Sequence, residues 1–217
     1  MRRNNRYSNE ETTFVIRNEE PSLNLLNGTL LGGIENNDPR SIWFTNEVYP
    51  DTVATALQQI ININYLDDQE ELRAALSGQT YIRHPIKLFV SSYGGNVYDG
   101  LGLVGLIRAS KTPVHTYAIG KVMSMGFILA ISGHKRFAYA HTSYMFHSLS
   151  SVHWGKFSEL QESVIEDERL QAKLDGLTTS LTNIEQERLN EVHVKKLDWY
   201  FDSEEALSFN CVDELIV

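Results

Sequence analysis

Apolar residues recur from residue 41 onward in two alternating patterns. Short runs of β-branched and aromatic residues, which favour strands, alternate with stretches in which apolar residues return every three or four positions, which favour amphipathic helices. This alternation predicts a sheet with crossover helices, an α/β fold. The predicted strands cover residues 41–45, 86–90, 113–119, 135–140 and 143–147.

The predicted helices lie between these strands and after the last of them. Asp51 is a suitable N-cap for the first helix, and the charged residues 67–79 that follow are expected on the surface as an insertion. A long, charged helix with a sparse apolar stripe is expected over residues 157–180, where a solvated helix is the simplest interpretation. Residues 182–185 then have the spacing of a capping box for one more helix.

The first forty residues show no regular pattern. Residues 2–11 are polar, residues 12–16 can form a short strand, and residues 23–31 are apolar enough to dock somewhere. Turn residues at 36–39 end this part. We therefore divide the chain into an N-terminal segment, 1–40, and one domain, 41–217.

Composition narrows the classes of function. Of the 217 residues 42% are hydrophobic and 22% charged, which is typical of a globular domain, and the net charge of −9 without a long basic stripe argues against nucleic acid as a partner. The single cysteine, Cys211, excludes an intrachain disulfide and favours a reducing compartment, so we expect the cytoplasm. We expect neither a secretory signal nor a membrane helix, since no apolar run approaches ~20 residues.

Candidate chemistry begins at residues 120–126, Gly-Lys-Val-Met-Ser-Met-Gly. This stretch follows a β-branched run and precedes an apolar run, which predicts a strand, a glycine turn and a helix start. Ser124 then lies at the first helical turn, where unpaired N–H groups favour a nucleophile, and the Met125 N–H is free to donate to an oxyanion. The alternative is that Ser124 only caps the helix.

A second glycine-containing turn follows the strand at 86–90. Gly94 and Gly95 allow the backbone to approach a ligand closely, and Gly95 could supply a second oxyanion donor. A tight turn and a phosphate loop are the alternatives. Neither nucleotide-binding glycine motif is present, so we expect no nucleotide and no other cofactor.

Of the seven histidines, His147 has the best position for a general base, because it closes the alternating run at 143–147. A lone histidine is more often structural than catalytic. No metal-ligand spacing such as His-Glu-x-x-His occurs, and with one cysteine we expect no metal site.

The sequence resembles the proteolytic subunit of Clp protease, the ClpP family. The resemblance rests on four blocks and runs from about Arg40 to the end of the chain. The blocks are 90–97 (Val-Ser-Ser-Tyr-Gly-Gly-Asn-Val), 120–126, 144–147 (Tyr-Met-Phe-His) and 197–201 (Leu-Asp-Trp-Tyr-Phe), the last followed by a Glu-Ala helix and Val-Asp.

The resemblance implies a crotonase-like fold, a ββα superhelix core with a protruding handle helix within residues 156–197. It implies a serine endopeptidase with Ser124 as nucleophile, His147 as base, Asp198 buried against the imidazole as orienter, and the N–H groups of Gly95 and Met125 as oxyanion hole. Heptameric rings, stacked in pairs through the handle, would enclose the sites. A separate AAA+ unfoldase of the Clp type would supply unfolded polypeptide substrates.

Several positions depart from the family pattern. Tyr93 replaces the usual proline before the glycine pair, and Lys87 stands where an aromatic often forms part of the pocket for the ATPase. Lys196 and Leu197 replace an Asp-Arg pair that often links the rings. These changes bear on the partner and on the contact between rings, whereas the three triad positions are intact.

Two other functions stay open. One is a structural ring subunit that has kept the fold without useful activity. The other is an acyl-CoA enzyme, because the crotonase fold also places two N–H donors around a thioester oxygen. The chain order Ser124, His147, Asp198 and the valine at 122, where a nucleophile elbow has glycine, argue against an α/β-hydrolase.

Overall fold

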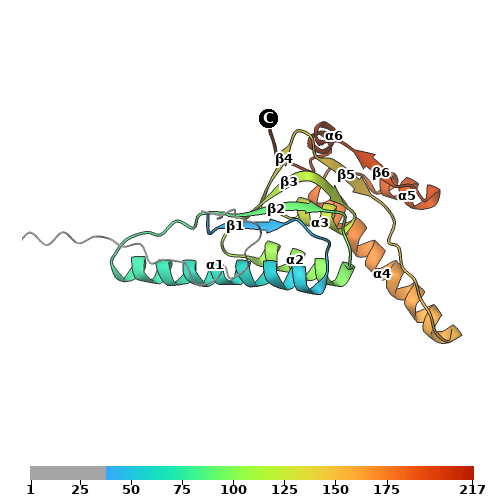
Figure 1. Ribbon diagram of the computed structural model, residues 1–217, viewed down its shortest axis with the longest axis horizontal. Coiled ribbons are helices and arrows are strands. Elements are labelled where there is room, and N and C mark those ends of the chain that lie inside the picture. The colour runs from blue at the N-terminus through green and yellow to red at the C-terminus, as the bar shows by residue number, and fades with distance from the viewer. Residues whose placement is uncertain (1–37) are drawn as a thin grey trace, which may run out of the picture. The chain divides into compact units, whose positions relative to one another are not determined.

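The computed structural model describes residues 38–217, of which Arg40–Val217 form one compact unit (Figure 1). The strand expected at 12–16 and the apolar segment at 23–31 lie outside the described residues. The strands are β1 (Ser41–Phe44), β2 (Ile86–Ser92), β3 (Val114–Met123), β4 (Lys135–Tyr139), β5 (Ser143–Phe146), β6 (Trp199–Phe201) and β7 (Glu214–Ile216). The helices are α1 (Pro50–Leu76), α2 (Val97–Ala109), α3 (Met125–Ile131), α4 (Phe157–Leu181), α5 (Gln186–Lys195) and α6 (Ser203–Ser208).

The sheet has the order β1-β2-β3-β4-β7, and all neighbours along this path are parallel. Figure 1 shows α1 and α2 side by side on one face of these strands, and α3 packs against β2 and β3. The α/β prediction with crossover helices is confirmed, because a parallel pair cannot be joined by a short hairpin.

Strand β3 changes its partner halfway along its length. Residues His115 to Ala118 pair with β4, whereas Lys121 to Met123 pair with β5, also in parallel. Gly120 lies between the two sections with a φ of 66°, a conformation that favours glycine. The sequence predicted that the strand ends at residue 119 in a glycine turn. The structure corrects this, because the strand bends at Gly120 and continues to Met123.

Beyond this bend β5 pairs antiparallel with β6, the one antiparallel ladder of the described chain. A small layer formed by β5, β6 and the second half of β3 thus branches from the main sheet. Aromatic side chains stabilise this layer, since Tyr144 stacks on Phe201 and Phe127 packs edge-on against both. This layer carries the residues of the site described below.

The face of the main sheet opposite the helices carries a row of aromatic side chains. Trp43, Phe89, Tyr117 and Phe137 occupy paired positions on four successive strands. Their ring centroids are 4.2 to 4.9 Å apart, and Trp43 is 55% exposed. Because β1 buries Ile42 and Phe44 on the other side, this row is an outward-facing apolar strip.

Helix α1 is longer than predicted. Residues 67–76 were expected as a charged surface insertion, but they continue the helix and Asp67 is buried. The Asp67 carboxylate accepts hydrogen bonds from Arg40, from the Tyr81 hydroxyl at 2.6 Å and from Thr112 Oγ1 at 2.5 Å. Although burial alone raises the pKa of Asp67, these bonds outweigh it and hold the pKa below its usual value.

Helix α4 is buried only along its C-terminal half. Its buried residues are Leu170, Leu174, Asp175 and Thr178, whereas its first three turns carry none. Figure 1 shows the N-terminal part of α4 extending away from the sheet. The long charged helix predicted from the sequence is therefore confirmed as an element that protrudes.

Two helix caps differ from the sequence predictions. The N-cap of α1 is Tyr49, so Asp51 lies inside the first turn. Thr182 and Glu185 do not form a capping box for α5, because Thr182 ends α4 and its Oγ1 bonds to Thr178 O at 2.7 Å. Within residues 38–217 no helix combines the length and the apolar character needed to cross a bilayer.

We expect Asp67→Asn to lower the free energy of unfolding at pH 7 by about 3 kcal/mol, since it removes the buried negative charge that accepts from Arg40, Tyr81 and Thr112. A carboxyl whose folded pKa is lowered stabilises the protein fully above its unfolded pKa of about 3.9, and this contribution disappears as the pH falls through the folded pKa. The gap in melting temperature between wild type and variant should therefore persist down to about pH 4 and narrow below it.

Asp68→Asn is the matched control, because Asp68 is adjacent but exposed and pairs with Arg83 at the surface. Its melting temperature should stay near that of the wild type. Equal melting temperatures for the Asp67 variant and the wild type at pH 7 would contradict a stabilising role for the buried carboxylate.

Candidate active site

Ser124 lies between the end of β3 and the start of α3 in an unusual backbone conformation. Its φ is 52° and its ψ is −123°, a region that non-glycine residues rarely occupy and that costs about 1–3 kcal/mol. The Ser124 N–H donates to Met145 O at 2.9 Å, which continues the β3–β5 ladder by one residue. This backbone conformation ends the ladder and places Ser124 at the N-terminus of α3.

The side chain of Ser124 does not cap α3. It makes no hydrogen bond to the first turn of the helix, although the residue occupies the N-cap position. Its Oγ lies 2.8 Å from His147 Nε2 instead. The structure therefore rejects the capping alternative for this serine.

His147 follows directly after β5. The parallel pairing of β5 with the second half of β3 brings residues 147 and 124 to the same edge of the small layer. The imidazole is about three-quarters buried, with 26% of the side chain exposed. A serine hydroxyl in contact with a largely buried imidazole is the arrangement from which a base can take the proton of a nucleophile.

Asp198 directly precedes β6. Because Phe146 pairs with Trp199 in the antiparallel ladder, the next positions, His147 and Asp198, face each other. The two are brought together as predicted, but His147 Nδ1 and Asp198 Oδ1 are 3.9 Å apart, beyond hydrogen-bond distance. The expectation of a buried orienter is wrong for this chain alone, because 61% of the Asp198 side chain is exposed.

Of the two expected oxyanion donors, Met125 directly follows the serine, and Gly95 follows Gly94, whose backbone lies close to Ser124. Met125 is the first residue of α3, so its N–H has no partner within the helix. Val48 pairs with the groups on either side of Gly95, accepting from Asn96 N–H and donating to Gly94 O, each at 2.7 Å. This parallel bridge leaves the Gly95 N–H pointing away from Val48.

Gly94 is the residue that the sequence analysis did not assign to the site. A Cβ on Gly94 would lie 2.7 Å from Ser124 Cβ and 2.9 Å from Met125 N, and the φ of Gly94 is 103°. The buried Ser92 fixes this turn, because its Oγ accepts from the Gly94 N–H at 3.1 Å. The adjacent glycines in the sequence were the available signal, but only the fold shows which one touches the serine.

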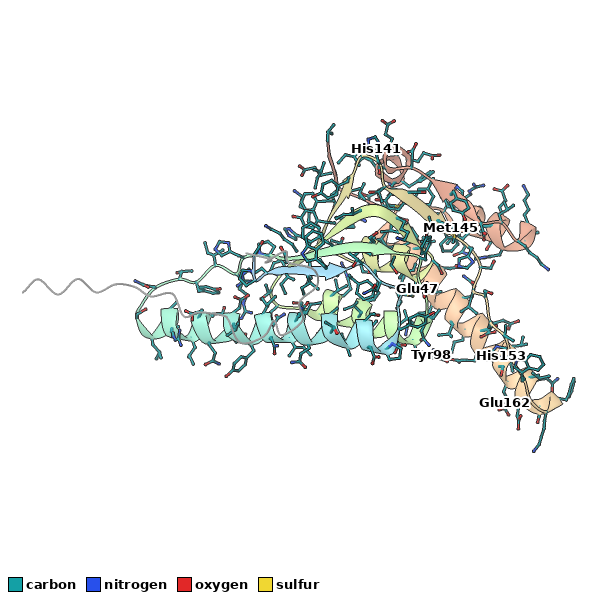
Figure 2. All side chains as sticks on the ribbon, viewed as in Figure 1. Glu47, Tyr98, His141, Met145, His153 and Glu162 are labelled. Carbon is teal, nitrogen blue, oxygen red and sulfur yellow. The ribbon has the colours of Figure 1, made fainter. Side chains whose placement is uncertain are left out.

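The segment after His147 runs along α4 and is attached to it repeatedly. Leu149 N–H donates to Gln171 Oε1 at 2.6 Å, His153 Nε2 lies 2.7 Å from Asp167, and Lys156 N–H donates to Glu159 at 2.9 Å. Figure 2 shows His153 and Glu162 on this outer part, far from Met145 on β5. The segment that follows His147 thus connects this residue to the protruding helix.

An acidic hollow of about 440 Å³ lies on the same side of α4, lined by Tyr98, His153 and Leu170 together with four carboxylates. The carboxylates belong to Glu159, Glu162, Glu166 and Asp167. Within residues 38–217 no three His, Cys, Asp or Glu side chains are placed to bind a metal. Glu166 is instead held by Arg169 and Tyr98, whose hydrogen bonds lower its pKa to about 2.

Comparisons with known proteins agree with this fold. Residues 38–217 match the protein family described as Clp protease. A protein named ATP-dependent Clp protease proteolytic subunit, from Deinococcus radiodurans, is 31% identical over 133 residues. This match spans 60% of the present chain and 64%, slightly under two thirds, of that relative.

The second such relative, ATP-dependent Clp protease proteolytic subunit 2 of Treponema pallidum, is 28% identical over 137 residues, or 62% of this chain and 68% of that one. A solved structure of a ClpP1 mutant from Listeria monocytogenes superimposes with a TM-score of 0.68 at 21% sequence identity. That superposition covers 82% of this chain and 92% of the other.

The branched parallel sheet with its protruding helix is thus an α/β fold of the crotonase-like class. The match over residues 38–217 then shows the family, and the chain belongs to the Clp proteases. The resemblance noted in the four sequence blocks is confirmed.

We expect Gly94→Ala to destabilise the protein by about 2–3 kcal/mol, because the new Cβ collides with backbone at Met125 and requires a strained φ. Thermal unfolding followed by circular dichroism measures this. Gly102→Ala is the matched control on α2, where a Cβ meets nothing within 4 Å. That change should leave stability unchanged or raise it by about 0.5–1 kcal/mol. A Gly94→Ala variant as stable as the control would show that the turn at residue 94 rearranges to accommodate a Cβ, which would contradict the predicted clash.

Proposed function

We propose that this chain is a serine endopeptidase that hydrolyses peptide bonds within an oligomeric chamber. The observation that carries the proposal is the 2.8 Å contact between Ser124 Oγ and His147 Nε2, at a serine that does not cap its helix. The family match supports a protease, since the relatives bear that name. No cofactor is needed for this chemistry.

In the proposed mechanism Ser124 Oγ attacks the carbonyl carbon of the scissile peptide while His147 Nε2 takes the hydroxyl proton. The carbonyl oxygen becomes an oxyanion held by the N–H groups of Gly95 and Met125. When the C–N bond breaks, His147 gives its proton to the leaving amine and an acyl-serine remains. Water, activated by His147, then releases the acyl group and restores the serine.

Asp198 has the role of orienter in the active state. It faces His147 across the ladder, and a small rotation of either side chain closes the 3.9 Å gap between Oδ1 and Nδ1. The carboxylate would then fix the imidazole tautomer and stabilise the imidazolium. We propose that assembly or substrate binding favours the closed arrangement, because Asp198 is exposed in the single chain.

The proposed assembly is a pair of stacked heptameric rings, and we assign the contact between the rings to the handle. Apolar side chains are exposed around the start of α4, with Trp154 90% and Phe157 76% exposed. Exposed apolar groups gathered in this way mark an interaction surface. A second copy of this chain is the proposed occupant.

The proposed partner is an AAA+ unfoldase of the Clp type, which would deliver unfolded polypeptides. The chain has no phosphate-binding glycine motif of its own. The aromatic strip of Trp43, Phe89, Tyr117 and Phe137 is the proposed docking surface, with Lys87 two positions before Phe89 on β2. The proposed compartment is the cytoplasm, which agrees with a single, buried cysteine, Cys211.

We expect Ser124→Ala and His147→Gln each to lower peptide hydrolysis by at least about 10³-fold, since each removes one member of a unit that acts together. A serine-directed fluorophosphonate should label the wild type at Ser124 and fail on the alanine variant. His141→Gln is the control, because His141 lies before β5, away from Met145 (Figure 2). An unlabelled, inactive wild type would favour a structural ring subunit, and thioester turnover without labelling would favour the acyl-CoA alternative.

For the assembly, the double change Trp154→Ser, Phe157→Ser should separate paired rings while leaving each ring intact, because it removes the exposed apolar groups at the start of α4. Light scattering of wild type and variant measures the two masses. Leu207→Ser, an exposed apolar residue on α6, is the control. A wild-type monomer at every micromolar concentration would refute the ring, whereas a stable single ring would refute only the pairing.

For the partner, short peptides should be cut without ATP, whereas a tagged, stably folded reporter should survive until a Clp-type ATPase and ATP are added. Lys87→Tyr should raise the rate of coupled degradation, because it extends the aromatic docking surface. Peptide cleavage by the same variant is the control and should not change. Rapid degradation of the folded reporter by the purified chain alone would show that the sites are not enclosed.

A further inference from the structure

Ser148, His193 and Asp175 form a second serine–histidine–aspartate chain of contacts, next to the proposed catalytic pair of Ser124 and His147. Ser148 Oγ lies 2.8 Å from His193 Nδ1, and His193 Nε2 lies 2.9 Å from Asp175 Oδ2. Ser148 follows His147 directly, Asp175 is on α4 and His193 is on the last turn of α5. The three residues thus join the segment at the base of the site to two helices.

The direction of these bonds follows from chemistry. An ionised carboxylate only accepts, so in the singly protonated tautomer of His193 the proton lies on Nε2 and points to Asp175. Nδ1 is then an acceptor, and the Ser148 hydroxyl donates to it. Asp175 is buried and also accepts from Gln171 at 2.9 Å and from Gln186 at 3.3 Å, so the carboxylate is a fixed end point.

His193 touches both neighbours of His147. It holds Ser148 by the hydrogen bond, and its ring lies 5.9 Å from the ring of Phe146 at a tilt of 50°. A second path leads to the same carboxylate, because Leu149 N–H bonds to Gln171, which bonds to Asp175. The backbone on either side of His147 is therefore fixed from α4 and α5.

These contacts matter because Asp198 does not hydrogen-bond to His147 in the single chain. Asp198 Oδ1 is 3.9 Å from His147 Nδ1 and does not hydrogen-bond to it, yet His147 Nε2 is 2.8 Å from Ser124 Oγ. The residues on either side of His147, Phe146 and Ser148, both contact His193 on α5.

We propose that His193, anchored by Asp175, is a positioning residue that holds the backbone at Ser148 and thereby aligns His147 with Ser124. The inference rests on the proposed function, since it assigns a further role within that site. It also gives α4 and α5 a direct influence on catalysis, because a shift of either helix moves the anchor of the general base.

The test compares two substitutions at one position. Gln places an acceptor and a donor about as far apart as the two ring nitrogens, so His193→Gln keeps the bridge, whereas His193→Leu keeps the volume and breaks it. We expect His193→Leu to lower kcat for a fluorogenic peptide about tenfold with KM within about twofold, and to slow fluorophosphonate labelling of Ser124 by a similar factor. His193→Gln should restore kcat to within about threefold of the wild type.

Ser148→Ala removes the same hydrogen bond with a smaller change in volume, and it should also lower kcat. This variant tests the inference if His193→Leu does not fold. His153→Leu is the matched control, because His153 also pairs with an aspartate on α4 but does not flank His147. Melting temperature and light scattering of each variant establish that fold and assembly are kept.

Wild-type kcat in both His193→Leu and Ser148→Ala would overturn the inference and leave the proposed function standing. Equal loss in His193→Leu and His193→Gln would also overturn it, because packing rather than the bridge would then matter. A wild-type chain that neither cleaves peptides nor labels at Ser124 would overturn the proposed function, and the positioning role with it.

Discussion

The exchange of partners along β3 is the constraint on which the site depends. A strand that paired with β4 over its whole length would have no edge left for β5, and His147 would have no route to Ser124. The bend at Gly120 frees the last residues of β3, and these pair with β5 in parallel. Because both strands then end at the same edge, the hydroxyl and the imidazole meet without any contribution from a mobile loop.

Long-range polar contacts keep this branched sheet in place. Arg136 on β4 donates to Leu181 O at 2.6 Å, to Asn210 O at 2.8 Å and to the Asp213 carboxylate. It therefore fixes the end of α4 and the approach to β7 from one strand. Burial alone raises the pKa of Asp213, but the bonds from Arg136 outweigh this and lower it, so the pair stays charged near neutral pH.

Much of the fold and the centre of the site could be predicted from the sequence. Periodicity located the strands because buried parallel strands require short apolar runs, and the glycine-bounded serine indicated a strand-to-helix turn. Asp67 was placed wrongly on the surface, because its partner Arg40 lies 27 residues earlier and periodicity is blind to such pairs. The distance from His147 to Asp198 and the bridge through His193 likewise depend on how β6 and α5 fold back, which no local pattern records.

The backbone of Ser124 also limits which amino acids can carry the chemistry at this position. A positive φ is tolerated by an unbranched side chain at moderate cost, but a second heavy atom on Cβ makes it a severe outlier. Threonine, which serves as a nucleophile in other hydrolases, is therefore sterically barred here, whereas cysteine has the right shape. The main-chain conformation thus restricts the proposed nucleophile to an unbranched side chain.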